Sequence, residues 1–204
     1  MSSILLLTSS PRAESLSTRI AAELAEKIKA QRPGSVIVHR DLVTSPLPHI
    51  DHHFTAAINK SADARTAEES RAIEASDALV DELLAADTVI LATGLINFNI
   101  SSLLKAWIDN IVRAGRTFKY GDTGAIGLAG GKKVYVVLAS GGVYSQGPAA
   151  SMNHAVPYLK FVLGFIGITD VEIIYVEGLA MGPEAAEKAI GAAKSRVEEL
   201  ALAA

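Results

Sequence analysis

The stretch from Thr88 to Asp109 constrains the fold most, because its hydrophobic pattern changes from that of a strand to that of a helix. Val89 to Ala92 is a short apolar run with β-branched residues, which is typical of a strand buried on both faces of a sheet. From about Ser101 the apolar residues recur every three or four positions, the period of one helix face: Leu103, Leu104, Trp107, Ile108 and Ile111. A loop from Gly94 to Asn99 joins the two parts. Since open α/β sheets bind ligands at the carboxyl ends of their strands, we expect a ligand at this loop.

The rest of the chain repeats the alternation of strand and helix patterns. Further strands are predicted at Ile4–Thr8, Val36–Val38, Lys133–Ala139 and Val171–Val176, and further helices at Leu16–Ala30, Ala64–Ala86, Ser151–Phe165 and Pro183–Leu202. Residues 41–60 are expected to be irregular because of Pro46 and Pro48, and the glycines between Gly121 and Gly131 indicate a turn-rich connection. The alternation predicts an α/β fold: one domain, residues 1–204, with a five-stranded parallel, doubly wound sheet and helices on both faces.

The composition excludes several classes of function. The 204 residues contain no cysteine, which rules out disulfides, a thiolate nucleophile and cysteine-ligated zinc or iron–sulfur clusters. The net charge of −3 gives no basic face for nucleic acid, and no apolar run approaches the ~20 residues that span a bilayer. The N-terminus lacks the basic segment of a secretory signal. We therefore expect a cytoplasmic protein with neither a nucleic-acid nor a membrane partner.

The loop after the first predicted strand is rich in hydroxyl groups. It joins that strand to the next helix through Ser9, Ser10, Arg12, Ser15, Ser17 and Thr18. A helix N-terminus offers free N–H groups to an anion, and hydroxyls add further donors for a terminal phosphate. The glycine patterns of a dinucleotide site and of a P-loop are both absent here. The alternative is that Ser15 or Ser17 only caps the helix, and the two roles are compatible.

Two later loops have the composition of a site for a flat ring. Leu95 and Ile96 offer apolar cover for a planar ligand, and the side-chain amide of Asn97 can read a polar edge. Gly141 and Gly142, after the next strand, let backbone N–H groups approach a ligand closely. Each loop alone is equally well a plain strand-to-helix connection. Three such loops at one sheet edge, one of them suited to phosphate, favour flavin mononucleotide (FMN) as the ligand.

A longer set of segments carries a family resemblance. Asn97–Ser101, Leu104–Asp109 and Arg113–Tyr120 together resemble the FMN-dependent NADH-azoreductases, which are flavodoxin-like NAD(P)H:quinone oxidoreductases. Gly164–Asp170 and Glu177-Gly178 resemble that family as well, as do Ser9 and Ser15–Ser17. The resemblance covers nearly the whole chain and implies a flavodoxin-like, FMN-binding domain that reduces quinones and aromatic azo compounds.

The resemblance also implies binding residues and a partner. FMN would be held by Ser9, Ser15, Leu16, Ser17, Leu95, Ile96, Asn97, Phe98, Ala139, Ser140, Gly141 and Gly142, with the first serines on the phosphate. The substrate pocket would be bordered by Phe118, Tyr120 and Tyr144, in a homodimer with two flavin sites at its interface. NADH or NADPH would pass hydride to the flavin N5 and leave before a quinone or azo compound binds. In this ping-pong exchange no side chain need act as acid or base, so no catalytic residue is predicted. Tyr120 and Tyr144 could donate a proton or form walls of the pocket, and we favour walls.

Two loops depart from the family pattern. Where the family has Pro-Met-Tyr before Asn-Phe, this chain has Gly94-Leu95-Ile96; where the family has Ser-Arg-Gly-Gly, it has Ala139-Ser140-Gly141-Gly142. An aromatic ring and a guanidinium are therefore missing, and a hydroxyl is displaced by one position. These changes leave open an alternative function, a flavin-binding electron carrier or sensor without quinone turnover. The net charge of −3 weighs against a carrier, since such proteins are strongly acidic.

Other enzyme classes fit less well. The nucleophile elbow G-x-S-x-G is absent, because the segment from Gly142 to Gly147 is one residue too long. A metal-like group of side chains is found on a proline-rich loop: His49, Asp51, His52 and His53. It lacks the H-E-x-x-H spacing of a zinc site, so we interpret it as a solvated loop and predict no metal.

Overall fold

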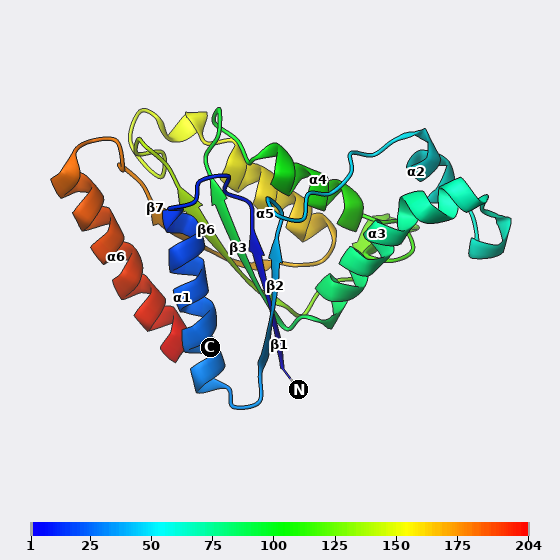
Figure 1. The fold of residues 1–204 in the computed structure, drawn as a ribbon, viewed down its shortest axis with the longest axis horizontal. Coiled ribbons are helices and arrows are strands. Elements are labelled where there is room, and N and C mark those ends of the chain that lie inside the picture. Colours follow the sequence, from blue (N-terminus) through cyan, green and yellow to red (C-terminus); the bar gives the residue numbers. More distant parts are fainter. Residues whose placement is uncertain (1, 204) are drawn as a thin grey trace.

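A five-stranded parallel sheet forms the centre of the computed structural model, which describes residues 2–203 (Figure 1). The strands are β1 (Ser3–Thr8), β2 (Val36–Asp41), β3 (Thr88–Gly94), β6 (Lys133–Ala139) and β7 (Asp170–Val176), in the order β2-β1-β3-β6-β7. Leu91 of β3 lies between Leu7 of β1 and Val136 of β6. β3 is therefore the central strand, and the predicted parallel, doubly wound sheet is confirmed.

Five long helices cover the two faces of the sheet. Helices α1 (Leu16–Gln31) and α6 (Pro183–Leu202) lie on one face, and α3 (Ala67–Ala85), α4 (Ser102–Ile111) and α5 (Ala155–Phe165) lie on the other (Figure 1). Side chains of β1 alternate between these layers: Ile4 and Leu6 belong to the core under α1 and α6, whereas Leu5 and Leu7 belong to the core under α3, α4 and α5. Burial on both faces explains why these strands are continuous apolar runs.

The prediction that residues 41–60 are irregular is wrong for one short segment. Helix α2 (His52–Ala57) begins after both prolines, and the Asp51 carboxylate caps it by accepting the N–H of Phe54 at 2.8 Å. Phe54 and Ala57 are buried against Ile73 of α3. Six residues are too few for a recognisable helical period, so the hydrophobic pattern did not reveal this helix. A single 3₁₀ turn, Ala62–Ala64, follows it.

Two strands that the sequence did not reveal lie at the start of the glycine-rich tract and just before it. β4 (Phe118–Gly121) and β5 (Gly124–Gly127) form an antiparallel hairpin instead of a simple turn-rich connection. Both strands are short and glycine-containing, which hides any alternating pattern. Helix α5 also begins later than predicted, at Ala155, after a 3₁₀ turn at Ala150–Met152. Pro157 then lies in the first turn of α5, where a missing N–H costs no hydrogen bond. None of the helices in residues 2–203 combines the length and hydropathy needed to cross a membrane.

Candidate functional site

Three loops meet at the carboxyl ends of β1, β3 and β6, at the top of the sheet in Figure 1. They are joined to neighbouring strands by backbone hydrogen bonds. The N–H of Ser9 donates to the carbonyl of Ala92 at 3.0 Å, and the N–H of Leu95 donates to the carbonyl of Ala139 at 2.8 Å. The structure therefore brings the three predicted ligand loops to one edge of the sheet.

The first loop ends in a capped helix N-terminus that retains free donors. The Ser15 hydroxyl accepts the N–H of Thr18 at 3.2 Å and lies 3.1 Å from the Ser17 hydroxyl, and both residues are buried. The Ser9 hydroxyl, also buried, donates to the carbonyl of Ala92. In residues 2–203 the N–H groups of Leu16 and Ser17 have no acceptor. Capping and anion binding are thus compatible here, because the cap uses a different N–H.

The second loop is a tight turn with an unfavourable backbone. Ile96 and Asn99 exchange two backbone hydrogen bonds, of 2.8 and 3.0 Å, around Asn97 at φ 47° and Phe98 at φ 68°. Residues other than glycine disfavour this left-handed region, an aromatic residue more than asparagine. The N–H of His154 donates to the carbonyl of Phe98 at 2.9 Å and holds the turn from outside. A loop held in this way presents its peptide groups in a fixed orientation.

The third loop is fixed through its carbonyl groups, which leaves its amides free. The carbonyl of Gly141 accepts the N–H of Ala180 at 2.9 Å, and that of Gly142 accepts the N–H of Gly178 at 3.0 Å. The N–H groups of Gly141 and Gly142 donate to nothing within the described part of the chain, and the same holds for Asn97 and Phe98. A Cβ on Gly142 would lie 3.1 Å from the ring of Tyr144, so any larger residue there would push against that ring.

The predicted substrate-pocket residues fall into two separate groups. Tyr144 lies at the loops, where its ring stands edge to face with Phe98 at a centroid distance of 6.1 Å. Phe118 is buried, and its ring centroid lies 4.7 Å from that of Phe165 at the far end of α5. The ring centroid of Tyr120 lies 5.5 Å from that of Phe118, and Tyr120 is 77% exposed. An 11-residue helix is about 16 Å long. Within one chain, therefore, Phe118 and Tyr120 do not border the same site as Tyr144.

The remaining predicted residues have structural partners. Leu16 is the first residue of α1, and Ala139 ends β6 with its carbonyl bonded to the N–H of Leu95. The Ser140 hydroxyl donates to the carbonyl of Gly142 at 2.8 Å and so points back into its own loop. Ile96 is 41% exposed, and it offers apolar surface beside the free amides of the turn. The three loops together present paired N–H donors and apolar cover, a combination suited to a flat ring that carries an anionic tail.

Comparison with known proteins identifies the family. A family model described as Flavodoxin-like fold matches residues 2–201. The chain belongs to this family. It is 76% identical to FMN-dependent NADH:quinone oxidoreductase 1 of Rhizobium etli and 68% identical to an FMN-dependent NADH:quinone oxidoreductase of Agrobacterium fabrum, each over 100% of both chains. The azoreductase structure from Bacillus anthracis superimposes with a TM-score of 0.91 at 32% identity, covering 98% of this chain and 99% of the other. The resemblance drawn from the sequence is thus confirmed.

A further FMN-dependent NADH-azoreductase structure, from Bacillus anthracis in complex with FMN, superimposes with a TM-score of 0.85 at 29% identity, covering 98% of this chain and 99% of that one. With sequence relatives at 76% identity and a structural match of this quality, the flavodoxin-like core extends over almost the whole chain.

Sequence reasoning predicted no role for two groups that support the loops of this flavodoxin-like domain. The Glu177 carboxylate accepts the N–H groups of Tyr144 and Ser145, and the backbone N–H of His154 holds Phe98. Glu177 directly follows β7, so its position after a parallel strand at the ligand edge is a signal that could have identified it. The contact of His154 depends on a backbone N–H, which any residue other than proline supplies, and the sequence gives no sign of it.

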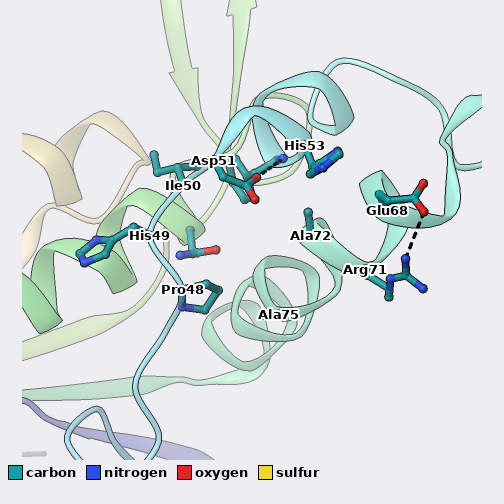
Figure 2. Close-up of a pocket in the computed structure, with 11 residues that line it drawn as sticks. Pro48, His49, Ile50, Asp51, His53, Glu68, Arg71, Ala72 and Ala75 are labelled. Carbon is teal, nitrogen blue, oxygen red and sulfur yellow. Dashed lines mark hydrogen bonds and ion pairs between the residues drawn. The ribbon is translucent and has the colours of Figure 1, made fainter.

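The histidine-containing segment lies beside a different cavity. A cavity of about 380 Å³ separates Pro48–Phe54 from α3, and Figure 2 shows the ring of His49 pointing away from Asp51 and His53. The N–H of Phe54 engages the Asp51 carboxylate and lowers its pKa. Across residues 2–203, no three histidine, aspartate or glutamate side chains lie in an arrangement that could hold a metal ion. Asp51 is a helix cap, and the ion pair of Glu68 with Arg71 borders the other side of the cavity (Figure 2).

Proposed function

We propose that this chain is an FMN-dependent NADH:quinone oxidoreductase that also reduces aromatic azo compounds. The observation that carries the proposal is the meeting of three pairs of free N–H donors at one sheet edge: Leu16 with Ser17, Asn97 with Phe98, and Gly141 with Gly142. The relative from Rhizobium etli, at 76% identity, is an FMN-dependent NADH:quinone oxidoreductase, and the shared edge of the sheet supports the same activity here.

The donors fit FMN in kind and in position along the sheet. A phosphate monoester accepts many hydrogen bonds, and the N-terminus of α1 offers two free amides beside the hydroxyls of Ser9, Ser15 and Ser17. The amides on the β3 and β6 loops suit the polar edge of a flavin ring, and Leu95 and Ile96 suit its apolar face. At Ser140, one of the departures from the family pattern, the hydroxyl donates to the carbonyl of Gly142 within its own loop.

Bound FMN would supply the chemistry of accepting a hydride from NADH and passing electrons to a quinone or azo group. The chain's own residues then have three tasks. The amides of Gly141 and Gly142 would stabilise negative charge that develops at the ring edge. Leu95 and Ile96 would exclude water from the ring face. Tyr144 and Phe98 would form an aromatic wall for the second ring that enters the site. No side chain is assigned a proton-transfer role.

The separation of Tyr120 from Tyr144 supports a homodimer. Tyr120 is 77% exposed on the β4–β5 hairpin, which packs near the end of α5 opposite to the loops, and α5 is about 16 Å long. It could border a substrate pocket only from a second copy of the chain, as the family resemblance implies. Sedimentation of the FMN-loaded protein at several concentrations tests this; an active monomer would contradict it. The ping-pong order of donor and acceptor and the cytoplasmic location stay predictions.

The visible spectrum of the purified protein with added FMN, recorded before and after anaerobic NADH, tests the activity. We expect a bound-flavin spectrum that bleaches with NADH and recovers when a quinone is added. Bound flavin that NADH does not bleach would favour the carrier or sensor alternative. A chain that does not bind FMN would overturn the proposal.

A further inference from the structure

Glu177 connects the end of β7 to the loop that follows β6. Its Oε2 atom accepts the N–H of Tyr144 at 2.7 Å and the N–H of Ser145 at 3.0 Å, and its Oε1 atom accepts the Ser145 hydroxyl. Three hydrogen bonds thus link one half-buried side chain to two adjacent residues that lie more than thirty positions earlier in the sequence. Charge-assisted bonds of this kind are stronger than neutral ones.

The linked loop has no regular structure of its own at this point. Between β6 and the 3₁₀ turn at Ala150–Met152 the chain forms neither helix nor strand. Besides Glu177, Tyr144 has one further hydrogen-bonded neighbour among residues 2–203, Asn153, whose side-chain amide reaches the Tyr144 carbonyl at 3.4 Å. Glu177 is therefore the main polar contact that sets where the backbone of Tyr144 lies.

The position of Tyr144 in turn affects both neighbouring ligand loops. Its ring lies 3.1 Å from where a Cβ of Gly142 would be, and it stands edge to face with Phe98 at 6.1 Å. A shift of Tyr144 would open the gap between the β3 and β6 loops. Among residues 2–203 no cationic side chain forms an ion pair with Glu177, so its charge is balanced by the donors of this loop and not by a competing partner.

We propose that Glu177 is a positioning residue for the reaction: it fixes Tyr144 as the aromatic wall against which the nicotinamide or quinone ring binds. The proposal rests on the proposed function. It predicts an effect on binding of the second ring more than on FMN itself, since the donors assigned to FMN lie on Gly141, Gly142 and two other loops.

Steady-state kinetics of the FMN-loaded Glu177→Ala and Glu177→Gln variants test this role. Glutamine keeps the geometry without the charge, because its carbonyl oxygen can accept both N–H groups and its NH₂ can donate to the Ser145 hydroxyl. For Glu177→Ala we expect KM for the quinone to rise about tenfold with kcat within about threefold of wild type. For Glu177→Gln we expect a quinone KM within about threefold of the wild-type value. Glu172→Ala, within β7 itself, loses an ion pair with Arg196 away from the loops and should leave KM unchanged.

A double variant and an activity-independent measurement complete the test. If Glu177 acts through Tyr144, Glu177→Ala should have no further effect on KM in a Tyr144→Ala background. Hydrogen exchange of the amides of Tyr144 and Ser145 should quicken at least tenfold in Glu177→Ala and stay near wild type in Glu177→Gln. Unchanged hydrogen exchange at Tyr144 and Ser145, or an unchanged KM in an active Glu177→Ala enzyme, would overturn the positioning role of Glu177. Neither result would contradict the proposed function. A wild-type protein that NADH cannot reduce would overturn the proposed function, and this role with it, even if the exchange result held.

Discussion

Ile96 and Asn99 close the turn after β3 by exchanging two backbone hydrogen bonds, and the two residues between them both adopt positive φ. The central strand of the sheet therefore ends in a turn that glycine would form more readily. Such turns with two positive φ values are normally rich in glycine and asparagine. Here Asn97 meets that preference, and Phe98 does not. The unfavourable backbone lies at the candidate site, where strain is commonly retained for function.

Substitutions of Asn97 should reveal the backbone cost of this turn. Asn97→Ala places a Cβ without a local hydrogen-bonding side chain at φ 47°, so we expect the apoprotein to lose about 1 kcal/mol of unfolding free energy relative to Asn97→Gly. That difference corresponds to about 2–4 °C in Tm for a chain of this size. Urea denaturation of both variants without flavin measures it. Equal stability of the two variants would show that the turn is unstrained.

Ser17→Ala should separate phosphate binding from ring binding. The Ser17 hydroxyl is buried 3.1 Å from the hydroxyl of Ser15 at the N-terminus of α1. A hydrogen bond to a charged group contributes about 1.5–3 kcal/mol, so FMN affinity should fall at least about tenfold. Riboflavin, which lacks the phosphate, should bind wild type and variant alike. Quenching of the fluorescence of Trp107, the single tryptophan, reports both affinities. An equal loss for riboflavin would place the hydroxyl elsewhere than at the phosphate.

Gly142→Ala should disturb the aromatic wall. The new methyl group would lie 3.1–3.2 Å from three atoms of the Tyr144 side chain, so the ring must move away. We expect quinone KM to rise several-fold, with FMN still bound through the unchanged backbone amides. Gly191→Ala in α6 is the matched control, since nothing lies within 4 Å of its Cβ position. That change should raise stability by about 0.5–1 kcal/mol and leave KM unaltered.

The sequence predicted the central sheet because buried parallel strands are continuous apolar runs. Ile4–Leu7, Val89–Ala92 and Val134–Leu138 all carry this pattern, and in the structure all three are buried on both faces. The ligand loops could be predicted for the same reason, since they follow directly from where those strands end. Helix α2 could not be predicted, because its six residues make fewer than two turns and show no recognisable hydrophobic period.

The placement of the aromatic residues required the structure. Phe98, Phe118, Tyr120 and Tyr144 all look alike as candidates for a pocket, yet they form two separate pairs, Phe98 with Tyr144 at the ligand loops and Phe118 with Tyr120 at the hairpin. The length of α5 and the hairpin that packs on its far end decide which of these aromatic residues come together. Both depend on contacts between residues that are distant in sequence. The role of Glu177 was hidden for a similar reason, since its partners lie on a different strand connection.

The capping box at the start of α3 should make the free energy of unfolding depend on pH in the acidic range. Glu69 is buried, and its carboxylate accepts bonds from the Lys60 ammonium at 2.6 Å and from the N–H of Thr66 at 2.9 Å. The bond from Lys60 is the main cause that lowers the pKa of Glu69, with the Thr66 amide next. Because the folded-state pKa lies below the unfolded value of about 4.3, the stabilisation is complete above that pH and is lost as the pH falls through the folded-state pKa.

Glu69→Gln tests this linkage. At pH 7 the variant should be less stable than wild type, because it loses the charge that pairs with Lys60. The difference in unfolding free energy should shrink as the pH falls below about 4, where wild type also becomes protonated. Urea denaturation between pH 3 and 7, roughly the range that brackets the titration of a glutamate, follows the difference. Glu74→Gln removes the same charge from an exposed position of α3 and serves as the control. A stability difference for Glu69→Gln that stays constant down to about pH 3 would mean that Glu69 contributes through shape and not through its charge.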